Sequence, residues 1–86
     1  METWRKGLEE ALTVNGEAWG DIEASTLTEE QLDEEFDDGF GGSEGCPFTV
    51  WTRKWVYFPC VYDGAEWVES VSRHPDGVPT EHVGGQ

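Results

Sequence analysis

The amino-acid sequence predicts one small domain of the α+β class, in which two short N-terminal helices are followed by a three-stranded antiparallel β-meander. Apolar residues at helical spacing near the N-terminus, a helix start signal before an acidic run, and two aromatic, β-branched runs joined by Asp63-Gly64 lead to this prediction. A chain of 86 residues can build one core and is too short for two. Five Trp, four Phe and two Tyr supply apolar area for that core.

The first helix is expected over residues 4–13, because Thr3 can cap its start and Asn15-Gly16 supplies a left-handed stop. Residues 17–27 show no sustained period and are expected to form a connection. The apolar stripe of the helix consists of Trp4, Leu8, Ala11 and Leu12. Three regions are therefore expected along the domain: an acidic helical half (1–44), the β-meander (45–80) and a flexible C-terminus (81–86).

The second helix is expected in the acidic run TEEQLDEEFDD. Thr28 and Gln31 have the spacing of a capping box, which fixes the start of the helix. Leu32 and Phe36 are four residues apart and would form the buried stripe, and Gly39 would end the helix. The remaining faces of such a helix would be almost wholly acidic.

Strands are expected over residues 48–52, 55–62 and 65–72, and Asp63-Gly64 favours a two-residue hairpin turn between the last two. That turn predicts three facing pairs: Tyr62 with Ala65, Cys60 with Trp67, and Phe58 with Glu69. The core face would then collect Val56, Phe58, Cys60, Tyr62, Trp67 and Val71.

The acidic residues are concentrated in the first half of a chain whose formal net charge is −14. Residues 1–44 hold fourteen Asp and Glu against two basic residues, and seven of the ten residues from Glu29 to Asp38 are carboxylates. Over about 15 Å of helix, duplex DNA would carry roughly nine phosphates, a similar linear density. Such a balance argues against direct binding to nucleic acid or anionic membranes and favours a basic partner.

Enzymatic chemistry has little support in the sequence. The two histidines, His74 and His82, lie in a turn and near the C-terminus, and no glycine-rich loop opens a helix after a strand. Cys46 and Cys60 lack the spacing of a zinc site, although a single bridge between them stays open. A calcium loop starting in the acidic run would have its glycine one place late. We expect no catalytic residue, no metal and no cofactor.

Three interpretations of the acidic run remain open: a solvated face, adaptation to high salt, and a functional role. A charge run is commonly a solvated face, and an acidic surface is also produced by adaptation to high salt. Like-charged residues four apart on a helix destabilise it by roughly 0.2–0.5 kcal/mol per pair, which favours a role of the acidic run other than stability.

No apolar run has the length of a membrane span, and the N-terminus lacks the apolar segment of a signal peptide, so a cytoplasmic location is expected.

In its short length, small α+β core, strongly negative face and lack of catalytic motifs, the chain resembles phage-encoded anti-defence inhibitors, including acidic anti-CRISPR proteins and other DNA mimics. The resemblance implies a non-enzymatic inhibitor in the host bacterial cytoplasm. Its partner would be a basic nucleic-acid-binding protein, such as a Cascade or Cas nuclease subunit of a CRISPR effector, whose recognition of DNA or of the PAM would be blocked.

The expected partner-binding residues are the carboxylates of the acidic run and one aromatic residue after it: Glu29, Glu30, Asp33, Glu34, Glu35, Asp37, Asp38 and Phe40. Trp19 and Trp55 are further candidates for apolar anchors. The alternative is an immunity or antitoxin-like protein that neutralises a basic nuclease, or a salt-adapted interaction module.

Overall fold

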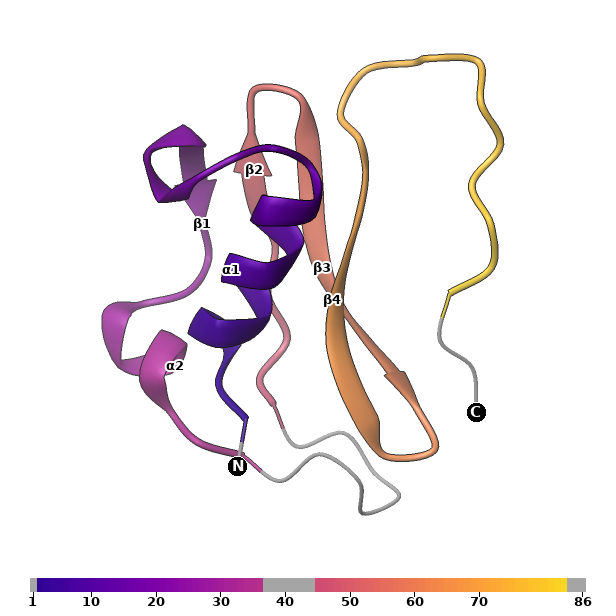
Figure 1. Ribbon diagram of the computed structural model, residues 1–86. Helices are drawn as coiled ribbons and strands as arrows, with labels where there is room; N and C mark the ends of the chain where they lie inside the picture. Colours follow the sequence, from indigo (N-terminus) through magenta and orange to yellow (C-terminus); the bar gives the residue numbers. More distant parts are fainter. Residues whose placement is uncertain (1, 37–44, 84–86) are drawn as a thin grey trace.

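The structure, a computed structural model, describes residues 2–36 and 45–83. The elements follow the chain in the order α1 (Trp4–Val14), a 3-10 turn (Trp19–Asp21), β1 (Ile22–Ser25), α2 (Glu29–Asp33), β2 (Val50–Thr52), β3 (Trp55–Tyr62) and β4 (Ala65–Ser72). The four strands form one antiparallel sheet in the order β1-β2-β3-β4 (Figure 1). The α+β class is confirmed. Residues 73–83 contain no helix or strand.

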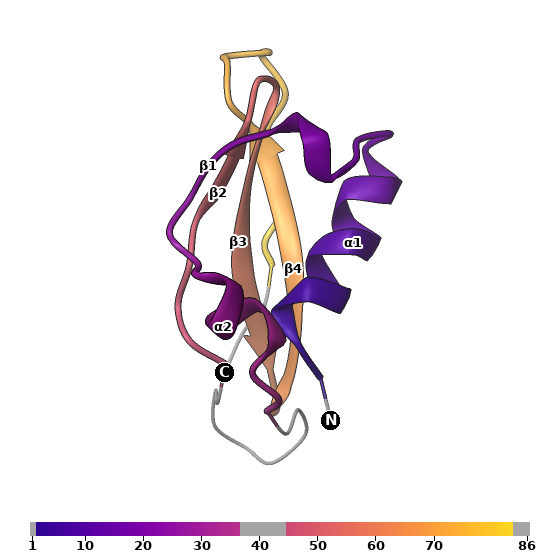
Figure 2. The same ribbon diagram turned by 90° about the vertical axis from the view of Figure 1, so that its left-hand side faces the viewer.

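Helix α1 packs beside β4 and supplies one wall of the core (Figure 2). The Thr3 hydroxyl caps it by accepting a hydrogen bond from the Lys6 amide at 3.2 Å. A Cβ atom added to Gly7 would lie 3.0 Å from a methyl carbon of Val68, so glycine permits this close approach of helix and strand. The buried residues of α1 are Trp4, Leu8 and Leu12, as its predicted stripe requires.

Trp4 lies at the centre of the core, with its ring 4.7 Å from that of Phe36 and 4.9 Å from that of Phe48, measured between centroids. Its indole N–H donates to the carbonyl oxygen of Cys46 at 2.9 Å. The first ring pair is tilted and the second is edge-to-face, and both geometries stabilise aromatic clusters. The complete core cluster is Trp4, Leu8, Leu12, Leu32, Phe36, Phe48, Val50, Tyr57 and Val68.

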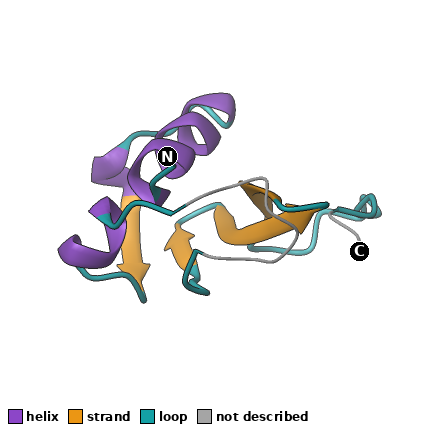
Figure 3. Cartoon of the chain, turned by 90° about the horizontal axis from the view of Figure 1, so that it is seen from below, coloured by secondary structure: helices purple, strands orange, loops and turns teal. Residues whose placement is uncertain are grey.

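The β3–β4 hairpin has the predicted turn and register. Asp63 and Gly64 both have positive φ, 52° and 86°, as a type I′ turn requires. The three predicted pairs are confirmed: Tyr62 with Ala65, Cys60 with Trp67, and Phe58 with Glu69. Seen from below, the helices gather toward the β1 side of the sheet and the hairpin extends away from them (Figure 3).

The predicted core face of the hairpin is wrong, because the opposite face lies under the helices. Tyr57 is fully buried and Val68 is 8 % exposed, whereas Tyr62 is 55 % exposed. Both faces of strand β3 are apolar, so the alternation of its residues does not show which face packs against the helices. The face that carries Tyr57 is favoured by the hydroxyl of that residue, which donates to Glu17 at 2.5 Å and accepts from the Asn15 amide at 3.1 Å. Of the residues assigned to the core face, Cys60 is buried at 9 % exposure. The other five are not buried: Val56, Phe58, Tyr62, Trp67 and Val71.

The sheet has four strands and not the predicted three. The additional strand, β1, comes from the segment expected to be a connection and pairs with β2 through Ile22–Thr52, Ala24–Trp51 and Ser25–Val50. Only Ile22 in β1 is partly buried and the rest of the strand is exposed, so its sequence carries no alternating pattern. The β2–β3 ladder stops at the Val50–Tyr57 pair, two residues before Pro59, which has no N–H to donate.

Candidate functional site

Helix α2 starts as predicted and ends early. Thr28 accepts a hydrogen bond from the Gln31 amide at 3.1 Å, and the Gln31 side chain accepts one from the Thr28 amide at 2.9 Å, which completes the capping box. The helix ends at Asp33, because Glu34 has extended backbone angles, φ −68° and ψ 123°. It therefore carries three of the predicted partner-binding carboxylates, those of Glu29, Glu30 and Asp33.

The early end of α2 is explained by a long-range backbone contact. The Phe36 amide donates to the Glu2 carbonyl and the Glu2 amide donates to the Phe36 carbonyl, each at 2.9 Å. A helix running through Phe36 could not make this reciprocal pair. Leu32 and Phe36 are both buried at 7 % exposure, but Leu32 reaches the core from the helix and Phe36 from extended chain. The predicted helical stripe is thus wrong, although both residues are core.

Arg5 of α1 lies against α2 and binds two of its carboxylates. Its Nε donates to Oδ1 of Asp33 at 2.6 Å, and its Nη2 donates to Oδ2 of Asp33 and Oε1 of Glu29, both at 3.1 Å. The guanidinium also lies over the Trp19 ring, 5.6 Å from the centroid. The Trp19 indole N–H in turn donates to Glu9 at 3.1 Å. This Arg5 clamp joins the two helices.

The clamp reverses the electrostatics expected for Glu29 and Asp33. As a pair four residues apart on one helix they would repel, but here they share one cation. The hydrogen bond from Arg5 lowers the pKa of the Asp33 carboxyl, and the two carboxylates raise the pKa of the guanidinium. Sequence reasoning missed Arg5, because it lies on α1, far along the chain from its partners.

Among the described residues of the predicted site, three carboxylates take part in no ion pair. Glu30, Glu34 and Glu35 are exposed, and the ion pairs of the described chain, which involve Arg5, Lys6 and Arg73, reach none of them. We call these three residues the acidic surface. Figure 1 shows its location on and just after α2, at the end of the molecule away from the β2–β3 turn.

The other predicted site residues do not join this surface within the described chain. Asp37, Asp38 and Phe40 lie outside the residues that the structure describes. Trp19 is half-buried and engaged by Arg5 and Glu9, and Trp55 is half-buried against the core. Both tryptophans therefore have structural partners.

The Lys and Arg residues outside α1 lie at the end of the sheet away from the acidic surface; they are Arg53, Lys54 and Arg73. The Arg73 amide donates to the carbonyl of Lys54 at 2.8 Å, and a ring nitrogen of His74 lies 3.1 Å from the carbonyl oxygen of Arg53. This brings the end of β4 onto the β2–β3 turn. Carboxylates lie beside these cations, since Arg73 pairs with Glu23 at 2.7 Å and Asp21 lines the same pocket as Arg53 and Lys54.

The described residues do not provide a metal site or a disulfide. Within residues 2–36 and 45–83, no group of three or more His, Cys, Asp or Glu side chains is arranged to hold a metal ion. Cys46 and Cys60 are free thiols, which settles the open question of a bridge. No helix in these ranges has the length and apolarity needed to cross a bilayer. Comparison with protein-family models, curated proteins and solved structures found no match.

Removal of the clamp tests its role in holding α2. In Arg5→Gln, we expect the Leu32 amide, which bonds to the Thr28 carbonyl at 3.0 Å, to exchange with solvent faster than in the wild type. Because the Asp33 pKa is lowered, the contact should stabilise the fold fully above about pH 4 and be lost as the pH falls through the folded-state pKa. Hydrogen exchange followed by NMR at pH 6 and pH 3 measures both effects.

Lys6→Gln is the matched control, since Lys6 is a neighbouring exposed cation whose ion pair, with Glu2 at 3.9 Å, does not involve α2. This variant should leave the Leu32 exchange rate at the wild-type value. Equal rates in Arg5→Gln and the wild type at pH 6 would show that α2 is held without the clamp.

Proposed function

We propose that the protein is a non-enzymatic inhibitor that binds a basic nucleic-acid-binding protein through the acidic surface. The partner is a CRISPR effector subunit, and the bound inhibitor acts as a DNA mimic that excludes the target duplex or its PAM. The observation that carries the proposal is the exposure of Glu30, Glu34 and Glu35 next to Glu29 and Asp33, which share the single positive charge of Arg5. These three side chains take part in no ion pair within the part of the chain that the structure describes.

Docking of α2 on the core supports this function, because a charge pattern that competes with DNA must have a fixed shape. Leu32 anchors α2 in the core from one side, and the Arg5 clamp ties it to α1 from another. The backbone of α2, which carries Glu30, therefore needs little ordering on binding, which lowers the entropic cost of association. The field of the acidic surface would also increase the rate of encounter with a basic channel, most strongly at low salt.

A competition assay tests the proposal. A purified CRISPR effector complex is bound to a fluorescent duplex that carries its PAM, and displacement by this protein is followed by anisotropy. We expect wild-type protein to displace the duplex and rising salt to weaken its binding. Glu30→Lys combined with Glu34→Lys should weaken inhibition by roughly 30-fold or more, at about 1 kcal/mol or more per reversed contact.

The control is Asp76→Lys combined with Glu81→Lys, which changes the net charge equally in the exposed segment after β4. This double variant should inhibit within about threefold of the wild type. If both double variants lose inhibition equally, net charge and not the acidic surface is responsible. If neither loses it, or if the wild type displaces no duplex, the proposal is wrong.

A further inference from the structure

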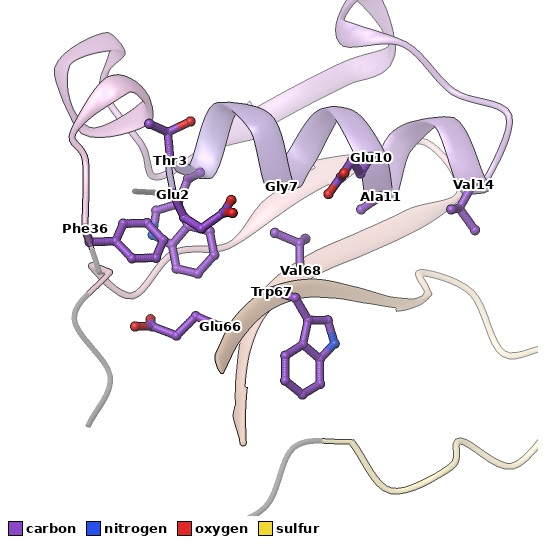
Figure 4. A pocket seen from close by; sticks show the side chains of 11 residues that line it. Glu2, Thr3, Gly7, Glu10, Ala11, Val14, Phe36, Glu66, Trp67 and Val68 are labelled. Atoms are coloured by element: carbon purple, nitrogen blue, oxygen red, sulfur yellow. The ribbon is translucent and has the colours of Figure 1, made fainter. Parts of the chain in front are cut away.

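We infer that the face of the sheet opposite the helices binds a second copy of this chain and forms a symmetric dimer. In Figure 4, Val68 points toward α1 and Trp67 lies on the other side of β4. The strand register places further apolar residues on the same side as Trp67. We call this surface the outer face, and its apolar residues are Trp51, Val56, Phe58, Cys60, Tyr62, Trp67 and Val71. None of them belongs to the acidic surface, so the inference goes beyond the proposed function.

The outer face is apolar although the described helices pack on the other side of the sheet. They join the core there through Val50, Tyr57 and Val68. When one face of an antiparallel sheet covers the core, its other face is normally polar. On the outer face, however, Tyr62 is exposed, and Phe58 and Trp67 are half-buried. Adjoining apolar side chains that remain partly in solvent are typical of a surface that contacts another protein.

Charge favours a second copy as the occupant. Two copies of a chain with a net charge of −14 repel each other. Strands β2, β3 and β4 contribute one charged residue to the outer face, Glu69, whose carboxylate accepts a hydrogen bond from the Trp67 indole at 2.8 Å. Two copies can therefore approach through this face with little local repulsion, whereas a basic partner would gain little electrostatic attraction from it.

The dimensions of the outer face suit such a dimer. β3 and β4 have eight residues each, which extend over about 27 Å, and three neighbouring strands are about 14 Å across. Two faces of this kind can stack about 10 Å apart with their side chains interdigitated, as in a β-sandwich. Both copies contribute the same surface, so the assembly closes at two chains. Because the footprint is at the small end of protein interfaces, we expect a dissociation constant of roughly 10–100 µM.

Sedimentation equilibrium of the full-length protein tests the inference. Between about 5 and 500 µM, we expect the mean mass to rise from the 9.7 kDa of one chain toward twice that value. Raising the NaCl concentration tenfold should favour the dimer, because salt screens the repulsion between the copies. The same change should weaken binding of a basic partner to the acidic surface, so the two interactions respond to salt with opposite signs. A mass that stays at 9.7 kDa at every concentration would overturn the inference.

Substitutions on the outer face locate the contact. Tyr62→Lys changes an exposed residue, so the variant should fold, and it also lowers the net negative charge. We expect dimerisation to weaken at least roughly tenfold even so, because the ammonium would be buried against apolar side chains. Trp67→Ala should weaken dimerisation by a similar factor, since it removes a large aromatic contact.

Val14→Lys is the matched control, because it makes the same change of charge at an apolar residue of α1 that is 85 % exposed and lies outside the outer face. This variant should dimerise at least as well as the wild type. Wild-type association in both Tyr62→Lys and Trp67→Ala would rule out the outer face, as would equal weakening in Val14→Lys and Tyr62→Lys. Glu30→Lys combined with Glu34→Lys should still dimerise, which separates this contact from the acidic surface.

Isotope-filtered NMR on a mixture of labelled and unlabelled protein identifies the contacting side chains. We expect nuclear Overhauser effects between copies at the rings of Trp51, Phe58 and Trp67, since face-to-face packing buries these rings. Contacts between copies that involve Glu30 and Lys54 instead would show head-to-tail electrostatic association and would overturn the inference.

Discussion

Replacing Trp4 with alanine is expected to remove a large part of the protein's stability at 25 °C. Trp4 is 2 % exposed and packs against Phe36, which lies within the acidic run, and against Phe48, which precedes β2. Truncation of a buried Trp costs about 3–5 kcal/mol, and the carbonyl of Cys46 would also lose its indole donor. An 86-residue domain has roughly 4–13 kcal/mol of stability in total.

Urea denaturation followed by far-UV circular dichroism measures this effect. The matched control is Trp67→Ala, which removes the same side chain from a half-buried site on the sheet face opposite the core. We expect the control to lose about 1–2 kcal/mol and to remain folded in water. A Trp4→Ala variant with a urea midpoint near that of the control would show that the aromatic cluster is not the main source of stability.

Raising the pH from 9 to 12 is expected to cost about 2 kcal/mol of stability through Tyr57 alone. Burial, followed by the hydrogen bond to the Glu17 carboxylate, raises the pKa of Tyr57 from 10 to about 12. Because the folded-state pKa is the higher one, this stabilisation is complete below pH 10 and is lost as the pH rises through 12. The unfolded chain releases the proton first, and alkali therefore favours unfolding.

Urea midpoints measured across this pH range for the wild type and Tyr57→Phe isolate the effect. The variant should lose about 1–2 kcal/mol at neutral pH, since Asn15 and Glu17 lose their partner, but should show a flatter decline above pH 10. Cys60, whose pKa burial also raises, titrates in both proteins and cancels in the comparison. Tyr62→Phe, at an exposed position, should keep the wild-type slope, and parallel curves for Tyr57→Phe and wild type would contradict the assignment.

Local signals in the sequence were sufficient wherever one short segment determines its own structure. The Asp63-Gly64 turn fixes the register of β3 and β4, because a two-residue loop allows one alignment of the strands. The Thr28–Gln31 box fixes the first turn of α2, and the spacing of Trp4, Leu8 and Leu12 identifies the buried side of α1. Each of these signals spans only a few residues.

The features that sequence reasoning missed depend on partners distant in the chain. Phe36 ends α2 early by pairing with Glu2, and Arg5 binds two carboxylates more than twenty positions away. β1 was missed because pairing with β2, and not its own composition, makes it a strand. Of the predicted site, the structure leaves the acidic surface exposed, assigns Glu29 and Asp33 to the clamp, and does not describe Asp37, Asp38 and Phe40.

The pairing of Ser25 with Val50 has a consequence for how this protein can change in evolution. The chain leaves the sheet at the end of β1 and returns at the start of β2, where Ser25 and Val50 are opposite each other and the Thr26 amide bonds to the Thr49 carbonyl at 3.0 Å. The acidic run is therefore an insertion between two paired strand ends. Its length and charge pattern can vary while the register of the sheet is preserved, provided that replacements for Leu32 and Phe36 still fill the core. One scaffold can thus carry different segments between β1 and β2, whereas this segment grafted onto another sheet would also need a core for Leu32 and Phe36 and a cation in the place of Arg5.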